Sequence, residues 1–128
     1  MAFSKSRRLV SNRQFKAVLN RGVRVNRGLL MLYMAKNNCD YSRLGVSVSR
    51  SYGGAVARNR LKRLLREVFR QNQDKIPVGF DYLFTVSLEG LRSSGKSIAQ
   101  PIFEQVNDSF WHLVSEAESL LKNTENKH

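Results

Sequence analysis

Residues 56–73 carry the most restrictive pattern of the chain, because apolar and basic side chains recur there with the period of an α-helix. At about 100° per residue, one arc collects apolar side chains: Ala57, Leu61, Leu64, Leu65 and Val68. The other arc collects basic and polar ones, with Arg58 at its border: Arg58, Asn59, Arg60, Lys62, Arg63, Arg66 and Arg70. Such a helix packs its apolar arc on another layer of the fold and leaves the basic arc exposed.

The basic arc holds a large share of the excess positive charge of the chain, which is +12 at pH 7. Glu67 is the only acid on it, although like charges at i, i+4 such as Lys62 and Arg66 repel each other. Solvated helix faces usually mix both signs, so the pattern favours a polyanionic partner, with nucleic acid first and an anionic membrane surface second. If the six cations from Arg58 to Arg70 met phosphates, log K would fall with log salt at a slope of roughly −4 to −5.

Strand patterns flank the basic helix. Arg43–Ser51 alternates apolar residues with small ones, which predicts one buried face and one open face that carries Ser47 and Ser49. Val23–Ala35 is either two strands or one strand bent at Gly28. Its apolar side chains alternate on both faces, so we expect both faces to be covered. Tyr82–Val86 predicts one further short strand.

Two other helices are predicted. Ser11–Arg21 begins with a capping box of Ser11 and Gln14, and a longer helix starts near Ser97 with Pro101 in its first turn. The order of elements predicts an α+β fold in which three helices pack on a small central sheet. A length of 128 residues suits a single domain, 1–128, in which we expect residues 1–10 and 123–128 to be flexible.

The sequence favours RNA over DNA as the polyanion. A DNA-binding helix-turn-helix needs a second helix just before the recognition helix, where this chain has a predicted strand. A small sheet that presents aromatic rings and hydroxyl groups beside a basic helix suits unpaired bases and phosphates of RNA. Phe15 and Tyr33, together with Ser47 and Ser49, are the candidates for such a surface, although Phe15 is equally explained by core packing.

No enzyme site of the protein's own is predicted. Gly90–Ser97 matches a phosphate-binding loop, but too few residues follow it for the sheet of a nucleotide-hydrolysing domain, so we assign no nucleotide. Metal-binding spacings of Cys and His are absent, and one of the two histidines is the terminal His128. The single Cys39 fits a reducing cytoplasm, and the longest apolar run, Leu29–Ala35, is far below the ~20 residues of a membrane span.

A family resemblance adds to this interpretation. The stretch Arg43–Arg50, followed by Gly53, Ala55-Val56 and the run Arg58-Asn59-Arg60-Leu61-Lys62-Arg63 with Arg66-Glu67, resembles the signature of the bacterial ribonuclease P protein component. The Arg-Asn-Arg triplet is the hallmark of that signature. The resemblance extends in order over roughly Leu9 to Leu121.

The resemblance implies a fold and a function. The fold is an α-β sandwich like domain 2 of ribosomal protein S5, with the basic helix in a left-handed βαβ crossover between parallel strands. The function is to join a catalytic RNA in the cytoplasm and to assist Mg²⁺-dependent removal of the 5′ leader from precursor tRNA. The RNA subunit binds most of the Mg²⁺ and supplies the active site. The implied partners are ribonuclease P RNA and precursor tRNA, with no DNA, no membrane and no obligate protein partner.

The resemblance also assigns residues, none of them catalytic. It assigns the contacts with the catalytic RNA to Arg58, Asn59, Arg60, Lys62, Arg63, Arg66 and Arg70. It assigns the cleft for the leader to Phe15, Tyr33, Ser47, Ser49 and Arg50. The chain departs from the family pattern at Leu19, where many members have a second aromatic, and at Ser51 and Gly54, where basic or polar residues are commoner. A stand-alone or ribosome-associated RNA-binding protein remains the alternative.

Overall fold

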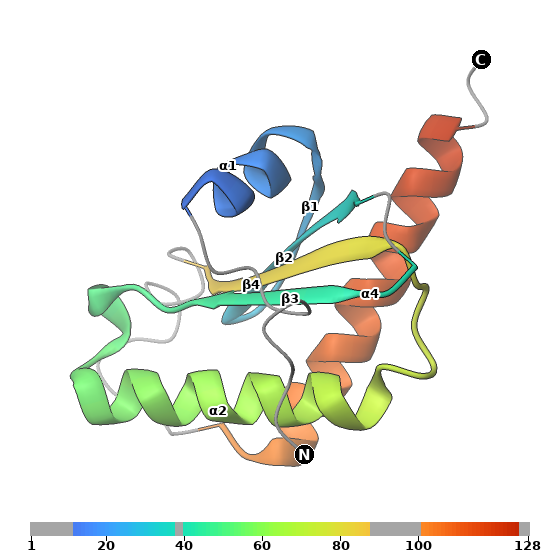
Figure 1. Ribbon diagram of the computed structural model, residues 1–128. Coiled ribbons are helices and arrows are strands. Elements are labelled where there is room, and N and C mark those ends of the chain that lie inside the picture. The colour runs from blue at the N-terminus through green and yellow to red at the C-terminus, as the bar shows by residue number, and fades with distance from the viewer. Residues whose placement is uncertain (1–11, 38–39, 88–100, 126–128) are drawn as a thin grey trace.

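The computed structural model describes residues 12–37, 40–87 and 101–125 of the chain (Figure 1). The elements follow in the order α1 (Asn12–Arg21), β1 (Val23–Arg27), β2 (Leu30–Lys36), β3 (Arg43–Ser47), the short 3₁₀ helix η2 (Arg50–Tyr52), α2 (Ala55–Asn72), β4 (Phe80–Val86) and α4 (Phe103–Glu125). Within these ranges, three α-helices and a four-stranded sheet confirm the predicted α+β class. The loop Gly90–Ser97 lies outside the described residues.

The strands form one mixed sheet in the order β1-β2-β4-β3. β2 pairs antiparallel with β1 and β4, whereas β3 and β4 run parallel. Two adjacent parallel strands need a crossover connection, and the basic helix α2 lies in that connection. The structure therefore places α2 between the parallel strands, as the resemblance implies.

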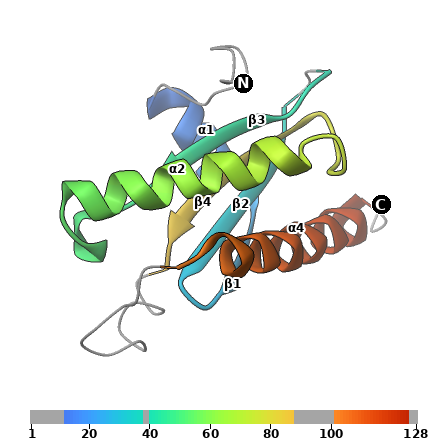
Figure 2. The ribbon, with the colours of Figure 1, turned by 90° about the horizontal axis from the view of Figure 1, so that it is seen from below.

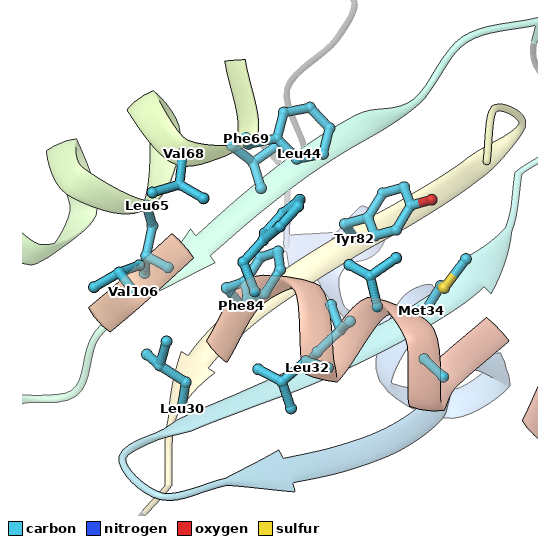
Figure 3. Packing of buried hydrophobic residues seen from close by; sticks show 14 of the residues in the cluster. Leu30, Leu32, Met34, Leu44, Leu65, Val68, Phe69, Tyr82, Phe84 and Val106 are labelled. Atoms are coloured by element: carbon cyan, nitrogen blue, oxygen red, sulfur yellow. The ribbon is translucent and has the colours of Figure 1, made fainter. Parts of the chain in front are cut away.

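The helices cover the two faces of the sheet unequally. α2 and α4 lie side by side on one face, and α1 lies on the other (Figures 1 and 2). The main core fills the layer between the sheet and the helices α2 and α4 (Figure 3). Its rings meet there: the Phe84 and Phe110 rings stack at 5.4 Å, and the Phe69 ring meets Tyr82 edge-on at 5.7 Å. α1 covers only a part of the opposite face, through a small cluster with Val18, Ala35 and Leu83 at its centre.

Two glycines shape the entry to the sheet. Gly28 has φ of 57° in the turn between β1 and β2, so Val23–Ala35 is two strands and not one bent strand. Gly22 follows α1, and a Cβ there would lie 2.6 Å from the Val18 carbonyl oxygen of α1 and 3.0 Å from the Met34 carbonyl oxygen of β2. A side chain at this position would therefore disturb both the end of α1 and its approach to the sheet.

The ends of several elements differ from the sequence prediction. α4 begins at Phe103 and not near Ser97, because the Ile102 amide donates to the Gln105 side chain at 3.0 Å while the Ile102 carbonyl accepts the first helical bond, from Val106. Pro101 therefore precedes the helix. At its other end α4 continues to Glu125, past the expected start of the tail at residue 123.

The strand prediction also changes in detail. β3 ends at Ser47, where its pairing with β4 ends, and the chain then enters η2. β4 begins at Phe80, two residues earlier than predicted. The expectation that both faces of β2 are covered is wrong for Met31 and Tyr33, which remain partly exposed because α1 is too short to reach across the whole face.

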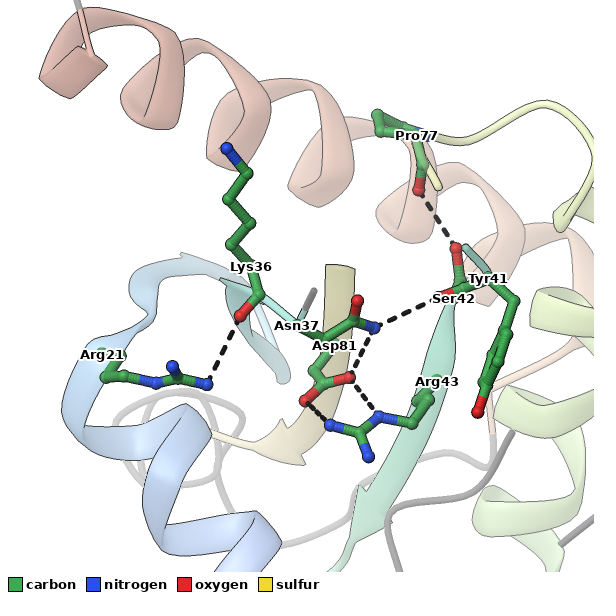
Figure 4. Close-up of polar contacts among 8 residues, drawn as sticks. All are labelled: Arg21, Lys36, Asn37, Tyr41, Ser42, Arg43, Pro77 and Asp81. Atoms are coloured by element: carbon green, nitrogen blue, oxygen red, sulfur yellow. Dashed lines mark hydrogen bonds and ion pairs between the residues drawn. The ribbon is translucent and has the colours of Figure 1, made fainter. Parts of the chain in front are cut away.

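A buried polar cluster fixes the pairing of β3 with β4. The Asp81 carboxylate accepts two hydrogen bonds of 2.7 Å from the Arg43 guanidinium and one of 2.9 Å from the Asn37 amide (Figure 4). The Asn37 amide also donates to the Tyr41 carbonyl at 3.1 Å, which holds the turn before β3. Because Arg43 and Asp81 stand opposite each other in the parallel pair, a slip of register would leave this carboxylate without its cation.

Candidate nucleic-acid interface

The basic face of α2 is built as the sequence predicts. Leu61, Leu65, Val68 and Phe69 are buried in the core, which turns the basic arc away from the sheet. The predicted RNA contacts divide into exposed side chains, Asn59, Arg60, Arg63 and Arg66, and partly buried ones, Arg58, Lys62 and Arg70. We call these seven residues the basic face.

Arg70 differs from the other members of the basic face because it has an acidic partner. Its Nε donates to Glu67 at 3.1 Å, and its second guanidinium nitrogen bonds the other carboxylate oxygen. The hydrogen bonds from Arg70 and then from Gln71 lower the pKa of Glu67 to about 2. The charge of Arg70 is thus matched within the helix, while the more N-terminal cations carry the net positive charge.

Arg58, the first residue of the Arg-Asn-Arg triplet, has a buried donor without an acceptor. Its Nε is enclosed and has no hydrogen-bond partner in the described part of the chain. A buried unpaired donor costs about 1–3 kcal/mol, so this atom lowers the stability of the free protein.

The sheet face on the side of α1 is ordered in rows by strand register. One row across the sheet contains Arg24, Tyr33 and Leu83, and the next contains Asn26, Met31, Thr85 and Ser47. α1 packs on the first row through Leu83 and Tyr33. Basic, amide, aromatic and hydroxyl groups therefore stand together on the open part of this face.

A groove follows these rows. Its narrower part, of about 260 Å³, runs between α1 and the sheet and is lined by Phe15, Leu19, Tyr33, Ser47, Leu83 and Thr85. Its wider part, of about 470 Å³, is lined by Arg24, Asn26, Met31, Tyr33, Ser49, Thr85, Val86 and Ser87. Tyr33 and Thr85 line both parts, so we treat them as one sheet groove.

Most of the predicted cleft residues lie in the sheet groove. Phe15 and Ser47 line its narrow part, Ser49 lines its wide part, and Tyr33 lines both. Phe15 also packs on the small cluster under α1, so core packing and groove lining apply to the same ring. Arg50 is exposed in η2 and is not among the residues that line the groove.

Sequence reasoning missed other lining residues, above all Arg24 and Asn26. Both are exposed on β1, with the buried Val25 between them. That period-two alternation is visible in the sequence and is sufficient to place the two side chains on one face. Met31 and Thr85 were missed because their exposure depends on how far α1 extends over the sheet, and Leu19 was noted only as a departure from the family pattern.

The described residues carry neither a metal-ligand cluster nor a membrane-spanning helix. Within residues 12–37, 40–87 and 101–125, His, Cys, Asp and Glu side chains nowhere gather in groups of three that could hold a metal ion. None of the described helices combines the length and the apolar character that crossing a membrane requires.

Sequence comparison identifies a family for this architecture. The family described as Ribonuclease P matches residues 3–118. A ribonuclease P protein component of Clostridium kluyveri is 39% identical over 112 residues, which are 86% of this chain and 93% of the relative. Another from a Thermotoga species is 35% identical over 124 residues, 97% of each chain.

Comparison with solved structures identifies the same family. The ribonuclease P protein of Thermotoga maritima superposes with a TM-score of 0.71 at 32% identity, over 85% of this chain and 96% of that one. The Staphylococcus aureus ribonuclease P protein superposes with a TM-score of 0.73 at 27% identity, over 88% and 96%. The basic face and the sheet groove thus occur on the fold of this family. The chain belongs to the family of ribonuclease P protein components and is the protein subunit of a ribonuclease P, an enzyme of tRNA processing.

Proposed function

We propose that the basic face of α2 binds the catalytic RNA of ribonuclease P, and that the sheet groove binds the single-stranded 5′ leader of precursor tRNA. The observation that carries this proposal is the placement of the two surfaces on opposite sides of one sheet, because α1 and α2 cover opposite faces (Figure 1). The protein can then hold two RNA segments at the same time.

The basic face suits the backbone of a structured RNA. Arginine outnumbers lysine on it, and a guanidinium forms paired hydrogen bonds with a phosphate. Arg60, Arg63 and Arg66 are exposed. These side chains provide charge and geometry for binding without any contribution to bond cleavage.

The sheet groove suits an unpaired strand. Phe15 and Tyr33 offer rings for base stacking, and the hydroxyls of Ser47, Ser49 and Thr85 offer donors and acceptors. Stacking on aromatic side chains requires bases that are not already paired in a duplex. The groove therefore favours the leader over the folded body of tRNA.

The chemistry in this proposal belongs to the RNA. Mg²⁺ would be held mainly by the RNA subunit and would supply an activated water and charge stabilisation at the phosphodiester between leader and mature tRNA. The residues of this chain bind the leader, orient it, and neutralise phosphates of both RNAs. No catalytic residue, nucleotide, DNA partner or membrane enters this scheme, and the expected compartment is the cytoplasm.

The test is cleavage of precursor tRNA by the cognate RNA subunit at low Mg²⁺, with and without this protein. We expect the protein to increase kcat/KM for precursor tRNA under these conditions. Binding to structured RNA without any change in cleavage would contradict the proposal and favour a stand-alone RNA-binding role.

A further inference from the structure

We infer that the wide part of the sheet groove is a second nucleotide subsite, in which Arg24 binds a leader phosphate and Asn26 contacts the edge of a base. This inference rests on the proposed binding of the leader in the sheet groove. It concerns two residues of the edge strand β1 that lie beyond the part covered by α1.

Strand register puts these two side chains beside the groove surface. Arg24 stands directly opposite Tyr33, and Asn26 stands directly opposite Met31 in the β1–β2 pair. Both are exposed and line the wide part of the groove. Opposite residues in an antiparallel pair have Cβ atoms about 4.5–5.5 Å apart, so the Arg24 and Tyr33 side chains lie within reach of one nucleotide.

The wide part is distinct from the part beneath α1. No residue of α1 lines it, and Phe15 and Leu19 belong only to the narrow part. Tyr33 and Thr85 connect the two parts. A strand whose base stacks near Phe15 can therefore continue past Tyr33 toward β1.

Arg24 and Asn26 are available for a ligand. Within the described ranges, neither side chain has a hydrogen-bond or ion-pair partner. Arg27, on the same strand but turned to the opposite face, pairs instead with Asp108 at 3.8 Å. The edge strand thus carries one arginine used within the fold and one arginine left for the groove.

The chemistry of the two groups gives them different roles. A guanidinium recognises the phosphate, which is the same for every nucleotide. A carboxamide presents a donor beside an acceptor and so distinguishes base edges. Arg24 should therefore add affinity for any leader, whereas Asn26 should make the affinity depend on one base.

The first experiment measures the affinity of the holoenzyme for precursor tRNAs whose leaders lengthen by single nucleotides. For the wild type we expect the affinity to rise in steps as the leader fills first the narrow and then the wide part. Arg24→Ala should remove the later step, which is a loss of about tenfold in affinity for precursor tRNAs with long leaders. The slope of log affinity against log salt should become shallower by about 0.7. Arg27→Ala, the matched control, makes the same charge change on the other face and should leave both steps in place.

The second experiment uses long leaders that differ in one base at the position where the later step occurs. The wild type should prefer one base by about tenfold, and Asn26→Ala should abolish this preference without changing the salt slope. Asn123→Ala is the matched control, because Asn123 is exposed on α4, and α4 lies on the face of the sheet opposite α1 and the groove (Figure 2).

The outcomes separate the inference from the proposed function. If leader length has no effect on wild-type affinity, the groove does not bind the leader and both are wrong. If the wild type shows both steps and Arg24→Ala resembles Arg27→Ala, the second subsite is wrong while leader binding stands. An unchanged base preference in Asn26→Ala would likewise overturn the role of that residue.

Discussion

At the scale of single residues, Asp81 shows how a buried charge fixes the strands that form the sheet groove. The residue is 1% exposed, and its carboxylate is held by Arg43 and Asn37. A pair of this kind does not by itself add much stability, but removal of one partner leaves a buried charge uncompensated. The cluster therefore fixes which residues of β3 and β4 stand side by side beneath the groove.

Arg43→Ala should lower the free energy of unfolding by about 3 kcal/mol, because the Asp81 carboxylate keeps only the Asn37 amide as a side-chain partner. Urea unfolding followed by circular dichroism measures the change. Arg27→Ala removes an exposed arginine whose ion-pair partner, Asp108, is also exposed, and should cost about 0.5 kcal/mol or less. Equal costs for the two variants would contradict the structural role of the buried pair.

Phe15→Ala should weaken binding of precursor tRNA by about 1–3 kcal/mol, because it removes a ring of the groove on which, in the proposed function, a leader base would stack. Mature tRNA lacks the leader, so its affinity should not change. Phe15→Leu keeps apolar packing on Val18 and Leu83 and serves as the control for folding. Equal losses for precursor and mature tRNA in filter-binding assays would remove Phe15 from the leader site.

At the scale of one element, α2 separates two tasks on opposite sides of a helix. One side enters the core with Leu61, Leu65 and Phe69, and the other side presents the basic face. Repulsion between its cations is relieved at one end only, where Glu67 pairs with Arg70. The N-terminal part of α2 therefore has the highest density of unmatched charge in the helix.

Arg60→Ala should weaken assembly with the catalytic RNA and lower the salt slope of assembly by about 0.9, the share of one phosphate contact. Arg60 is exposed, so the urea midpoint should not move. Lys122→Ala on α4 removes the same charge from an exposed site outside the basic face and should leave assembly unchanged. An equal effect of both variants would mean that net charge, and not the basic face, drives assembly.

The Glu67–Arg70 pair predicts a pH dependence with a definite sign. The pKa of Glu67 is about 2 in the folded chain, below its ordinary value of 4.5, so the unfolded chain binds more protons between these values. The stabilisation from the pair is complete above about pH 4.5 and is lost as the pH falls toward 2. Arg70→Gln should return the pKa of Glu67 toward 4.5 in a carboxyl NMR titration, and an unchanged pKa would contradict the pairing.

At the scale of the whole molecule, periodicity in the sequence was sufficient for the order of the elements, the basic face and much of the groove. It was not sufficient for the order of strands, because the pairing of β2 with β4 joins segments far apart in the chain. Nor could it place Arg24 and Asn26 at a binding surface, since that depends on how little of the sheet α1 covers. The predicted start of α4 was wrong, because the hydrogen bond from the Ile102 amide to the Gln105 side chain is a local contact that periodicity does not reveal.

The core predicts that the molecule unfolds as one unit. Phe110 of α4 meets Phe69 of α2 at 6.4 Å and Phe84 of β4 at 5.4 Å, so its ring connects three elements. Phe110→Ala should lower the free energy of unfolding by about 3–5 kcal/mol. Circular dichroism and the fluorescence of Trp111, the single tryptophan, should report the same midpoint, and two separate midpoints would contradict a shared core.

Placement of the basic face and the sheet groove on opposite sides of one sheet has a kinetic consequence. In the proposed function, a precursor docked on the catalytic RNA that α2 holds would meet the groove within the same assembly. Leader binding would then be intramolecular, at an effective concentration set by the geometry of the complex. Contacts with a few nucleotides would be sufficient under these conditions. Cleavage would remove the tether, so the free leader would bind only by its contacts with the groove and would leave it for the next precursor.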